Sequence, residues 1–530
     1  MTQLLAPIDD LDIEELKKLL LQVLEDNAQL KKDIQALRDE NARLKGLNGK
    51  PDIKPSGMEK QAKPRSGNKG SRGKPRRRGS KNNKLTIDES KILKPDHLPE
   101  GSTFKGYEDY IVQDLILRPW TVLYRRQRWR TPKGETIVGE LPKSISGHFG
   151  SGLIRFVLSQ YYKCRVTLPL VTGQLHDLGV TISERQVMRL LIKDKGSFLD
   201  ESLDILRAGL ETAGWVSVDD TGARHKARNG YCTHIGNDHF AWFKTTHSKS
   251  RLNFLELLRA GDKAYQINAA ALDYMRDCNL ADRLITALAS HESLVFADFD
   301  AWMAHLETLG FTKLTTHPDP VRIASEGALW GRIVALGLLE GTIIVSDGAG
   351  QFRVGDHALC WVHGERLLHK LDAFSQQQRR AKQRIRHRIW WLYADIKDYC
   401  HDPTPKRKHQ LRRRFDSIFT TKTNFVTLDR LLKRLHQRRH EFLRVLERPD
   451  IPMHTNGSEN DIRCQVIKRK ISGGTRSDDG RDCRDAFLSL MKTCAKLGIN
   501  FWDYLGDRLS HPGAPNIPHL PNLIRQKETA

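Results

Sequence analysis

The sequence lacks the features that mark membrane and secreted proteins. No stretch approaches the roughly 18 apolar residues needed to cross a bilayer. The N-terminus, MTQLLAPIDDLD, has no basic head followed by an apolar core, which excludes a signal peptide. The eight cysteines are scattered without a CxxC pair, so we expect reduced thiols. Together these absences predict a cytoplasmic protein without a membrane partner.

Acidic residues are scarce relative to basic ones. The chain has 64 Asp and Glu against 87 Lys and Arg, a formal net charge of +23 and a pI near 9.7. This balance indicates a polyanionic partner, and nucleic acid is a better candidate than an anionic membrane surface. At 530 residues the chain is long enough for several domains.

The N-terminal region carries a heptad pattern. Apolar residues recur from Ile13 to Leu44 with alternating spacings of four and three, and Asn27 and Asn41 occupy a-type positions. Asparagine there fixes the register and favours a parallel two-stranded coiled coil. We therefore predict that residues 1–48 form a homodimer or a higher oligomer. The alternative is a lone amphipathic helix packed on its own domain.

A basic, apolar-poor segment follows at residues 49–84 and includes GSRGKPRRRGSK. Its composition predicts disorder when free. It either neutralises DNA phosphates without reading sequence or serves as a plain solvated linker.

Three stretches place carboxylates where strands end or helices begin. A short apolar run ends in Asp219 and Asp220 within GWVSVDDTGAR, and a β-branched run ends in Asp347 within GTIIVSDGAGQ. In HTNGSENDIR, Asn456 or Ser458 is expected to cap a helix with Glu459 in its first turn. Singly, each acid is equally a turn residue or a cap partner. Converging, they would hold two divalent ions, Mg²⁺ or Mn²⁺, for phosphodiester chemistry.

These blocks carry a family resemblance. GWVSVDDTGAR, SDGAGQF followed by HALCWVHGERLLHKL, and NGSENDIR followed by IKRKISGG resemble, in that order, the acidic blocks of insertion-sequence transposases of the IS66 family. The resemblance implies an RNase H-like fold with a DDE triad, in which Asp219, Asp347 and Glu459 are catalytic and bind metal. Asp220 stands where many members have Glu, so either aspartate could be the ligand.

The resemblance also implies partners. They are double-stranded DNA, as element ends and target, and small accessory transposition proteins, in a bacterial, nucleoid-associated setting. Many relatives carry a cysteine-based zinc segment in the region corresponding to residues 85–145. No cysteine precedes Cys164 here, so no zinc is expected. Cys360 and His363 alone are too few for a zinc site and are predicted to be core residues, although His363 could contact phosphate.

The predicted fold class is multidomain α+β, combining the N-terminal coiled coil, a helix-turn-helix-like helical domain, and an RNase H-like α/β catalytic core with a large basic helical insertion. The stretch SLVFADFDAW resembles a strand ending in Asp298 and Asp300, which are the competing carboxylates. The expected regions after the linker are a small β-rich module (85–145), the helical domain (146–210), a first core segment (211–350), the insertion (351–450), a second core segment (451–510) and a peripheral tail (511–530).

Several basic residues are candidate DNA contacts. Ser183 and Gln186 form an expected capping box at the start of a helix that would offer Arg185 and Arg189 to DNA. The basic insertion is expected to clamp DNA, with a solvated helical face as the alternative. Basic residues on or just beyond the Glu459 helix would hold scissile phosphates: Arg463, Lys468, Arg469 and Lys470.

The sequence thus predicts a DNA transposase that cuts element ends and transfers strands into target DNA. The alternatives are a catalytically inactive DNA-binding regulator, a structure-specific nuclease on the same fold, and a coiled-coil scaffold that binds RNA.

Overall fold

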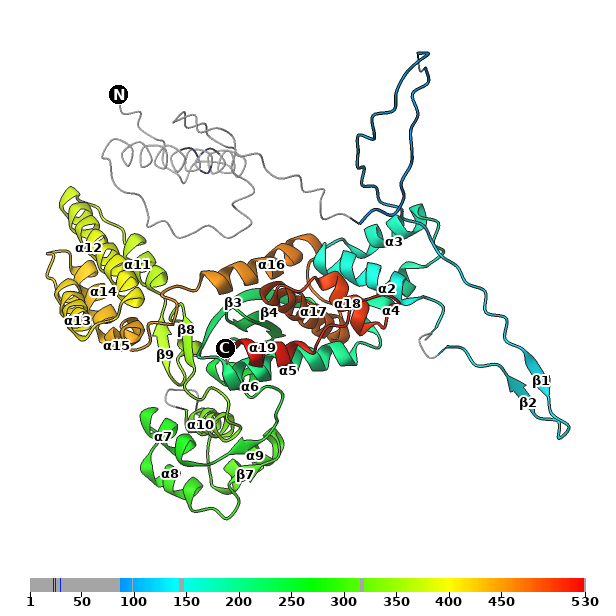
Figure 1. The fold of residues 1–530 in the computed structure, drawn as a ribbon. Helices are drawn as coiled ribbons and strands as arrows, with labels where there is room; N and C mark the ends of the chain where they lie inside the picture. The colour runs from blue at the N-terminus through cyan, green and yellow to red at the C-terminus, as the bar shows by residue number, and fades with distance from the viewer. Residues whose placement is uncertain are drawn as a thin grey trace, which may run out of the picture. The chain divides into compact units, whose positions relative to one another are not determined.

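Figure 1 shows a computed structural model of the chain, which describes residues 22, 24, 29, 86–97, 99–142, 147–314 and 319–528. The predicted coiled coil, apart from those three isolated helical positions, and the predicted basic linker lie outside the described residues. The chain divides into two compact units, Met1–Arg77 and Arg78–Ala530, and the fold given below is that of the second.

A five-stranded mixed sheet forms the centre of this unit. Its strands are β3 (Trp215–His225), β4 (Arg228–Gly236), β5 (Ala241–Thr246), β8 (Ile343–Ser346) and β9 (His357–Leu359), in the spatial order β5-β4-β3-β8-β9. The strands β3, β4 and β5 pair antiparallel, whereas β8 runs parallel to both β3 and β9. The turn between β4 and β5 is held by Asn237, whose Oδ1 accepts hydrogen bonds from the backbone N–H groups of His239 and Phe240.

The first acidic strand is longer than predicted. We expected it to end at Asp219 and Asp220, but β3 continues to His225. Both aspartates remain in the ladder because their backbones lie opposite His234 and Thr233 of β4. Pairing with a later strand therefore overrides the local tendency of Asp to end one.

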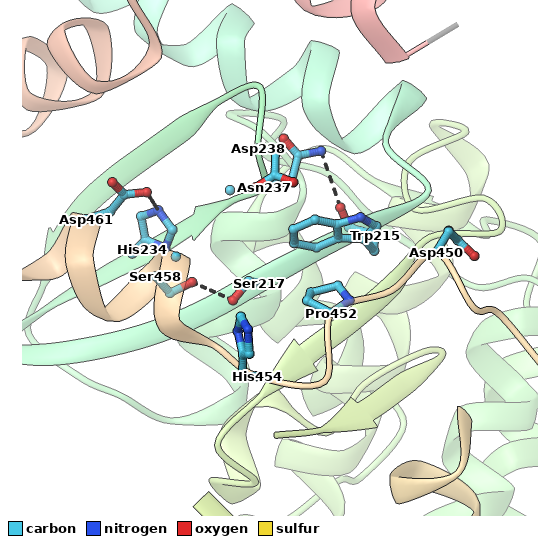
Figure 2. Close-up of a pocket in the computed structure, with 12 residues that line it drawn as sticks. Trp215, Ser217, His234, Asn237, Asp238, Asp450, Pro452, His454, Ser458 and Asp461 are labelled. Carbon is cyan, nitrogen blue, oxygen red and sulfur yellow. Dashed lines mark hydrogen bonds and ion pairs between the residues drawn. The ribbon is translucent and has the colours of Figure 1, made fainter. Parts of the chain in front are cut away.

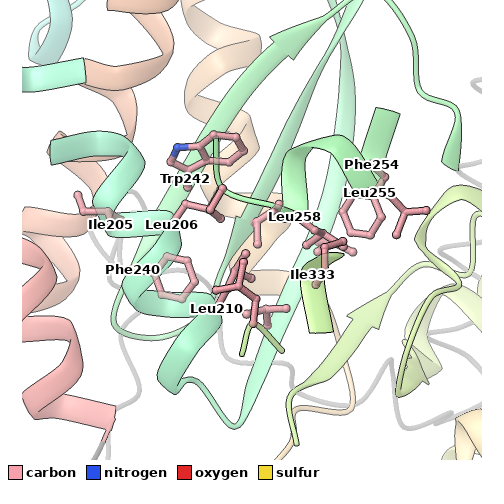
Figure 3. Packing of buried hydrophobic residues seen from close by; sticks show 14 of the residues in the cluster. Ile205, Leu206, Leu210, Phe240, Trp242, Phe254, Leu255, Leu258 and Ile333 are labelled. Carbon is pink, nitrogen blue, oxygen red and sulfur yellow. The ribbon is translucent and has the colours of Figure 1, made fainter. Parts of the chain in front are cut away.

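Helices cover the sheet and supply its core. In α5 (Gly196–Thr212) the buried apolar residues recur at helical spacing and pack against residues of β5 and of α6 (Arg251–Leu258), as Figure 3 shows. Gly209 of α5 faces the ring of Phe240, and an added Cβ there would lie only 2.2 Å from the ring carbon Cζ. The close approach of the helix to the sheet thus requires glycine at this position.

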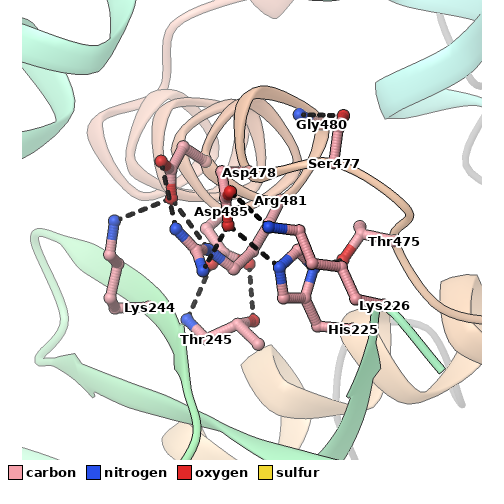
Figure 4. A network of polar contacts seen from close by, with 11 residues as sticks. His225, Lys226, Lys244, Thr245, Thr475, Ser477, Asp478, Gly480, Arg481 and Asp485 are labelled. Atoms are coloured by element: carbon pink, nitrogen blue, oxygen red, sulfur yellow. Dashed lines mark hydrogen bonds and ion pairs between the residues drawn. The ribbon is translucent and has the colours of Figure 1, made fainter. Parts of the chain in front are cut away.

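The outer edge of β5 is closed by α17 (Asp478–Leu497). The backbone N–H groups of Ala241, Phe243 and Thr245 donate to side chains of Thr493, Ser489 and Asp485 at 3.2, 3.0 and 2.7 Å. Four residues of a helix rise about 6 Å, which is close to the rise of two residues of a strand. The N–H groups of β5 and the acceptor side chains of α17 therefore stay in register. Burial raises the pKa of Asp485 to about 6. Figure 4 shows this carboxylate beside the Asp478 and Arg481 contacts of the same helix.

A helical segment separates β5 from β8. It contains α6, α7 (Ala269–Asp277), α8 (Asp282–Ala289), α9 (Phe299–Thr308) and α10 (Pro320–Ala335), with a two-stranded sheet of β6 (Tyr265–Gln266) and β7 (Val295–Phe296). Asp298, the competing candidate carboxylate, caps α9 by accepting a 2.9 Å bond from the Ala301 N–H. It follows β7 by two residues and lies outside the central sheet.

A second helical segment follows β9. It consists of α11 (Trp361–His369), α12 (Gln376–His401), α13 (Pro405–Phe419), α14 (Val426–Gln437) and α15 (Arg439–Phe442). These helices form their own hydrophobic core around Trp361, Phe415 and Phe442, which continues onto Ile343 and Val345 of β8. The segment is therefore packed against the sheet rather than tethered to it.

The N-terminal helices are α2 (Ser151–Leu158), the π-helical turn η4 (Ser159–Lys163), α3 (Leu168–Asp177) and α4 (Glu184–Ile192). The predicted Ser183–Gln186 capping box is confirmed at the start of α4. No described helix combines the length and apolarity needed to span a bilayer.

Two boundary predictions were wrong. In place of a β-rich module over residues 85–145, the only described strands there are β1 (Arg128–Arg130) and β2 (Thr136–Val138), because the side chains of this segment stay exposed and form no core. The tail after Pro512 is not peripheral. In α19 (Leu520–Glu528), Leu520 and Ile524 are fully buried, and the helix packs on α5.

Candidate active site

Asp219 lies in the middle of β3 and is half-buried. Alternate residues of a strand face the same side of the sheet, so Asp219 and Ser217 share one face. The helix α16 (Asn456–Ser472) covers that face. Burial, followed by the negative charges of Asp347, Asp220 and Glu459, raises the pKa of the Asp219 carboxyl to about 7. The three acids identified in the sequence therefore lie close enough to repel one another.

Asp347 comes directly after β8, as predicted. Ser217 of β3 lies opposite Val345 of β8 in a parallel pair, and Asp219 and Asp347 follow each of them by two residues. The parallel register therefore brings both carboxylates to the same edge of the sheet.

Glu459 lies in the first turn of α16, as predicted, but the expected cap is wrong. Thr455 is the N-cap residue, without a side-chain cap bond, and Asn456 already belongs to the helix. Ser458 instead shares a 2.6 Å hydrogen bond with Ser217. This bond ties the helix start to β3 beside Asp219, so Ser458 positions the helix rather than caps it.

Two residues of α11 hold Glu459 from the other side. His363 Nε2 lies 3.4 Å and Arg366 Nη2 lies 3.7 Å from Glu459 Oε1. Burial, followed by the charge of Arg366, lowers the pKa of His363. His363 was predicted to be a core residue, and it is instead half-buried and faces the acids.

Asp220 has a different environment. Its Oδ2 accepts a 2.8 Å hydrogen bond from Gln351 Nε2, and as the next residue along β3 it faces the opposite side of the sheet from Asp219. Burial raises its pKa, while Gln351 and Lys249 lower it. Of the two aspartates, therefore, Asp219 lies on the face of the sheet that α16 covers.

The turn that carries Asp347 is held by residues that the sequence did not reveal. Gly348, at φ +94°, adopts a conformation that favours glycine, and its carbonyl accepts a 3.2 Å bond from Arg438. Arg438 is paired with the buried Glu441, which also lies 3.6 Å from His357 Nδ1. His357 Nε2 in turn bonds Ser346 Oγ at 2.8 Å. Glu441 thus reaches both residues that flank Asp347.

A cavity of 190 Å³ lies between the β4–β5 turn and the start of α16 (Figure 2), and Asp219, Asp347 and Glu459 do not line it. Its wall includes the Ser217–Ser458 bond and the buried pair His234 and Asp461, whose Nε2 and Oδ2 are 3.4 Å apart. Lys492 and Lys496 also contact Asp461, at 3.2 and 3.0 Å. These contacts fix the first turns of α16 against β4 and α17.

The chemistry of the acids suits a hard divalent cation. All three offer carboxylate oxygens, and the pKa of Asp219, raised by burial and then by the neighbouring negative charges, is of the kind that a bound cation would lower. Across the described ranges, however, no three His, Cys, Asp or Glu side chains are already grouped so that they could hold a metal ion.

The predicted DNA contacts have varied positions. Arg185 and Arg189 are exposed on α4, and Arg463 and Lys470 are exposed on α16, with Arg469 half-exposed. Lys468 does not fit a DNA contact. It is buried, its Nζ donates to the Tyr161 carbonyl at 3.1 Å, and the same nitrogen lies 3.7 Å from the Tyr161 ring centroid. Burial lowers its pKa to about 7.

Parts of this chain are similar to known proteins. The model of the family described as "Transposase IS66 family" matches residues 336–482, a range that includes Asp347, Glu459 and the helices between them. A protein of Sinorhizobium fredii called "Uncharacterized protein y4jO" is 48% identical over 323 residues, which is 61% of this chain and all of that relative.

Proposed function

Because the chain belongs to the IS66 family of transposases, we propose that it cuts the ends of its insertion sequence and joins them to target DNA, using Asp219, Asp347 and Glu459 as a DDE triad. The observation that carries this proposal is that three acids far apart in the chain are brought to one place: the parallel register of β3 and β8 brings Asp219 and Asp347 to the same edge of the sheet, and the Ser217–Ser458 bond ties the start of the Glu459 helix beside Asp219. Purely structural turn or cap residues have no reason to converge.

The sheet supports an RNase H-like core. Three antiparallel strands, β3 to β5, are followed by β8 and β9, which run parallel to β3. The first and second acids lie on adjacent parallel strands of this sheet, and the third lies on a helix that covers it.

Asp219, Asp347 and Glu459 would hold two Mg²⁺ or Mn²⁺ ions. Bound ions would supply Lewis-acid activation of the attacking oxygen and charge stabilisation of the leaving oxygen. Since no preformed metal group is present among the described residues, the carboxylates would draw together on binding.

The chain's own residues supply orientation. His363 and Arg366 fix the Glu459 carboxylate, and the contacts of Glu441 fix the turn of Asp347. Gln351 donates a hydrogen bond to Asp220. A neutral His363 would leave the negative charge of Glu459 available for metal. Orientation of this kind lowers the barrier because little rearrangement remains for the reaction itself.

DNA would contact the exposed basic residues. Arg463, Arg469 and Lys470 extend from the helix of Glu459, and Arg185 and Arg189 are exposed on the second helix of a helix-turn-helix-like pair. The predicted coiled coil would bring two chains, and hence two element ends, into one complex. Small accessory transposition proteins are expected as further partners.

The test is cleavage and strand joining of labelled DNA that carries the element's own ends, with Mg²⁺ and the accessory proteins, by wild type, D347N and D300N. Asp300 is an exposed aspartate in the first turn of α9, so D300N is a matched control for loss of one charge. We expect D347N to bind DNA but neither cut nor join, and D300N to match wild type. Cleavage without joining by wild type would favour a nuclease. Binding without reaction by every protein would favour an inactive regulator.

A further inference from the structure

The solvent-facing side of α12 carries an unusual combination of side chains. Arg380, Arg384 and Trp391 are exposed and His387 is half-exposed, at intervals of four, three and four residues that place them along one face of the helix. The opposite face is buried in the core of the second helical segment through Ile385, Ile389, Leu392 and Ile396. The orientation of this face toward solvent is therefore fixed by packing.

Trp391 is not accounted for by that packing. Its side chain is 63% exposed, and its ring centroid lies 6.4 Å from that of His387. The neighbouring Trp390 instead packs edge-to-face on Tyr393, with centroids 5.4 Å apart. One large indole is thus left in water beside one that is packed, and an external partner would cover it.

The surroundings of Trp391 are strongly cationic. Between Gln376 and Gln437 the chain has 17 Lys and Arg against five Asp and no Glu. Within the residues that the structure describes, the side chains of Arg380 and Arg384 have neither a hydrogen bond nor an ion pair. Their charges are therefore free for an anionic ligand.

A nucleic acid fits this face better than a protein does. The buried core of a protein interface is depleted of charged residues, whereas Trp391 is a single aromatic ring among cations. The exposed Phe374 precedes the first turn of α12 and lies about four turns away along the helix axis. An isolated aromatic ring with flanking arginines is the composition of a site that stacks a base and neutralises its phosphates.

The spacing also fits a single strand. Arg384 and Trp391 are seven residues apart, an axial distance of about 10 Å, which corresponds to about three phosphates at the spacing of a stacked strand. In a duplex the bases are paired and stacked on each other, so an indole on a helix surface reaches no free base face.

We propose that the Arg380–Arg384–His387–Trp391 face of α12 binds unpaired bases of DNA, with the Trp391 indole stacked on one base and the arginines on adjacent phosphates. This inference rests on the proposed function, because cutting and joining expose single-stranded ends. It assigns those ends a site outside the three carboxylates.

The test measures binding of the full chain, without divalent metal, to a fluorescein-labelled oligothymidylate strand and to a blunt duplex of the same length. We expect W391A to weaken strand binding roughly tenfold or more and to change duplex binding less than about twofold. W391F should retain most strand affinity because a phenyl ring also stacks. V426A removes another exposed apolar side chain, on α14, and should match wild type for both ligands.

Equal strand binding by W391A and V426A would overturn the inference, as would equal weakening of strand and duplex by W391A. If wild type binds duplex but no strand, this site is refuted while the proposed function stands. If wild type binds neither the strand nor the duplex, both the site on α12 and the proposed function are refuted. Loss of chain association in W391A with unchanged strand affinity would identify a protein contact instead and would also refute the site.

Discussion

Replacing Glu441 with Gln tests whether a buried carboxylate holds the turn of Asp347 in place. Glu441 is 2% exposed and contacts three basic side chains: Arg438, Arg353 at 3.1 Å and His357 at 3.6 Å. E441Q keeps the size of the side chain but removes its charge. The partners would then be left as uncompensated positive or polar groups next to the turn after β8.

The magnitude follows from the pKa of Glu441. Burial alone would raise it, but the contacts with His357 and Arg438 lower it from 4.5 to about 2. Each tenfold change in acid dissociation corresponds to about 1.4 kcal/mol, so the folded state gains about 3 kcal/mol from the ionised form. Because the folded pKa lies below the unfolded one, this contribution is complete above pH 4.5 and is lost as the pH falls toward 2.

Native-state hydrogen exchange of α15 and β9 measures this local stability without requiring the whole chain to unfold reversibly. We expect the free energy of opening measured by hydrogen exchange to be about 3 kcal/mol lower in E441Q than in wild type at pH 7. This difference between the two proteins should narrow below pH 4.5. E447Q is a matched control, because Glu447 pairs with Lys408 and Arg412 at the surface and should cost less than about 1 kcal/mol. A loss in E441Q below about 1 kcal/mol, or one independent of pH, would refute the reasoning.

Other predictions concern two residues with displaced pKa values. Since the Asp219 pKa is about 7, Mg²⁺ affinity measured by calorimetry should rise about fivefold from pH 6 to pH 7, reach about tenfold by pH 8 and level off above it, and D219N should abolish this dependence. A flat wild-type profile would contradict it. The lowered pKa of Lys468 disfavours folding below pH 10.5 and most strongly at or below pH 7, so K468M should stabilise α16 by about 1–3 kcal/mol at pH 7 and by less at pH 10 in hydrogen-exchange measurements. Equal or lower stability of K468M at pH 7 would contradict it.

Local signals in the sequence predicted much of the architecture near the acids. A β-branched run followed by Asp347 and Gly348 specifies a strand and a tight turn, and the Ser183–Gln186 pair specifies a helix start. Such features depend on a few neighbouring residues, so sequence reasoning finds them.

The features that sequence reasoning missed depend on distant partners. Lys468 is buried against Tyr161, 307 residues earlier, so a basic residue on a helix next to Glu459 was mistaken for a surface residue. Glu441 lies far from Asp347 in the chain and reaches it only through Arg438 and His357. The one available signal was a lone Glu after a long basic stretch that is otherwise without Glu.

The three acids of the proposed triad are dispersed along the chain, and this affects the order of events during synthesis. Asp219 precedes Glu459 by 240 residues, which a ribosome adding about 5–20 residues per second needs about 10–50 s to make. The helices from α2 to α5 and the hairpin of β3 and β4 emerge before this interval ends, whereas the third carboxylate does not. A nascent chain would therefore be able to reach DNA well before it could cut it. Cutting would be confined to chains translated past Glu459.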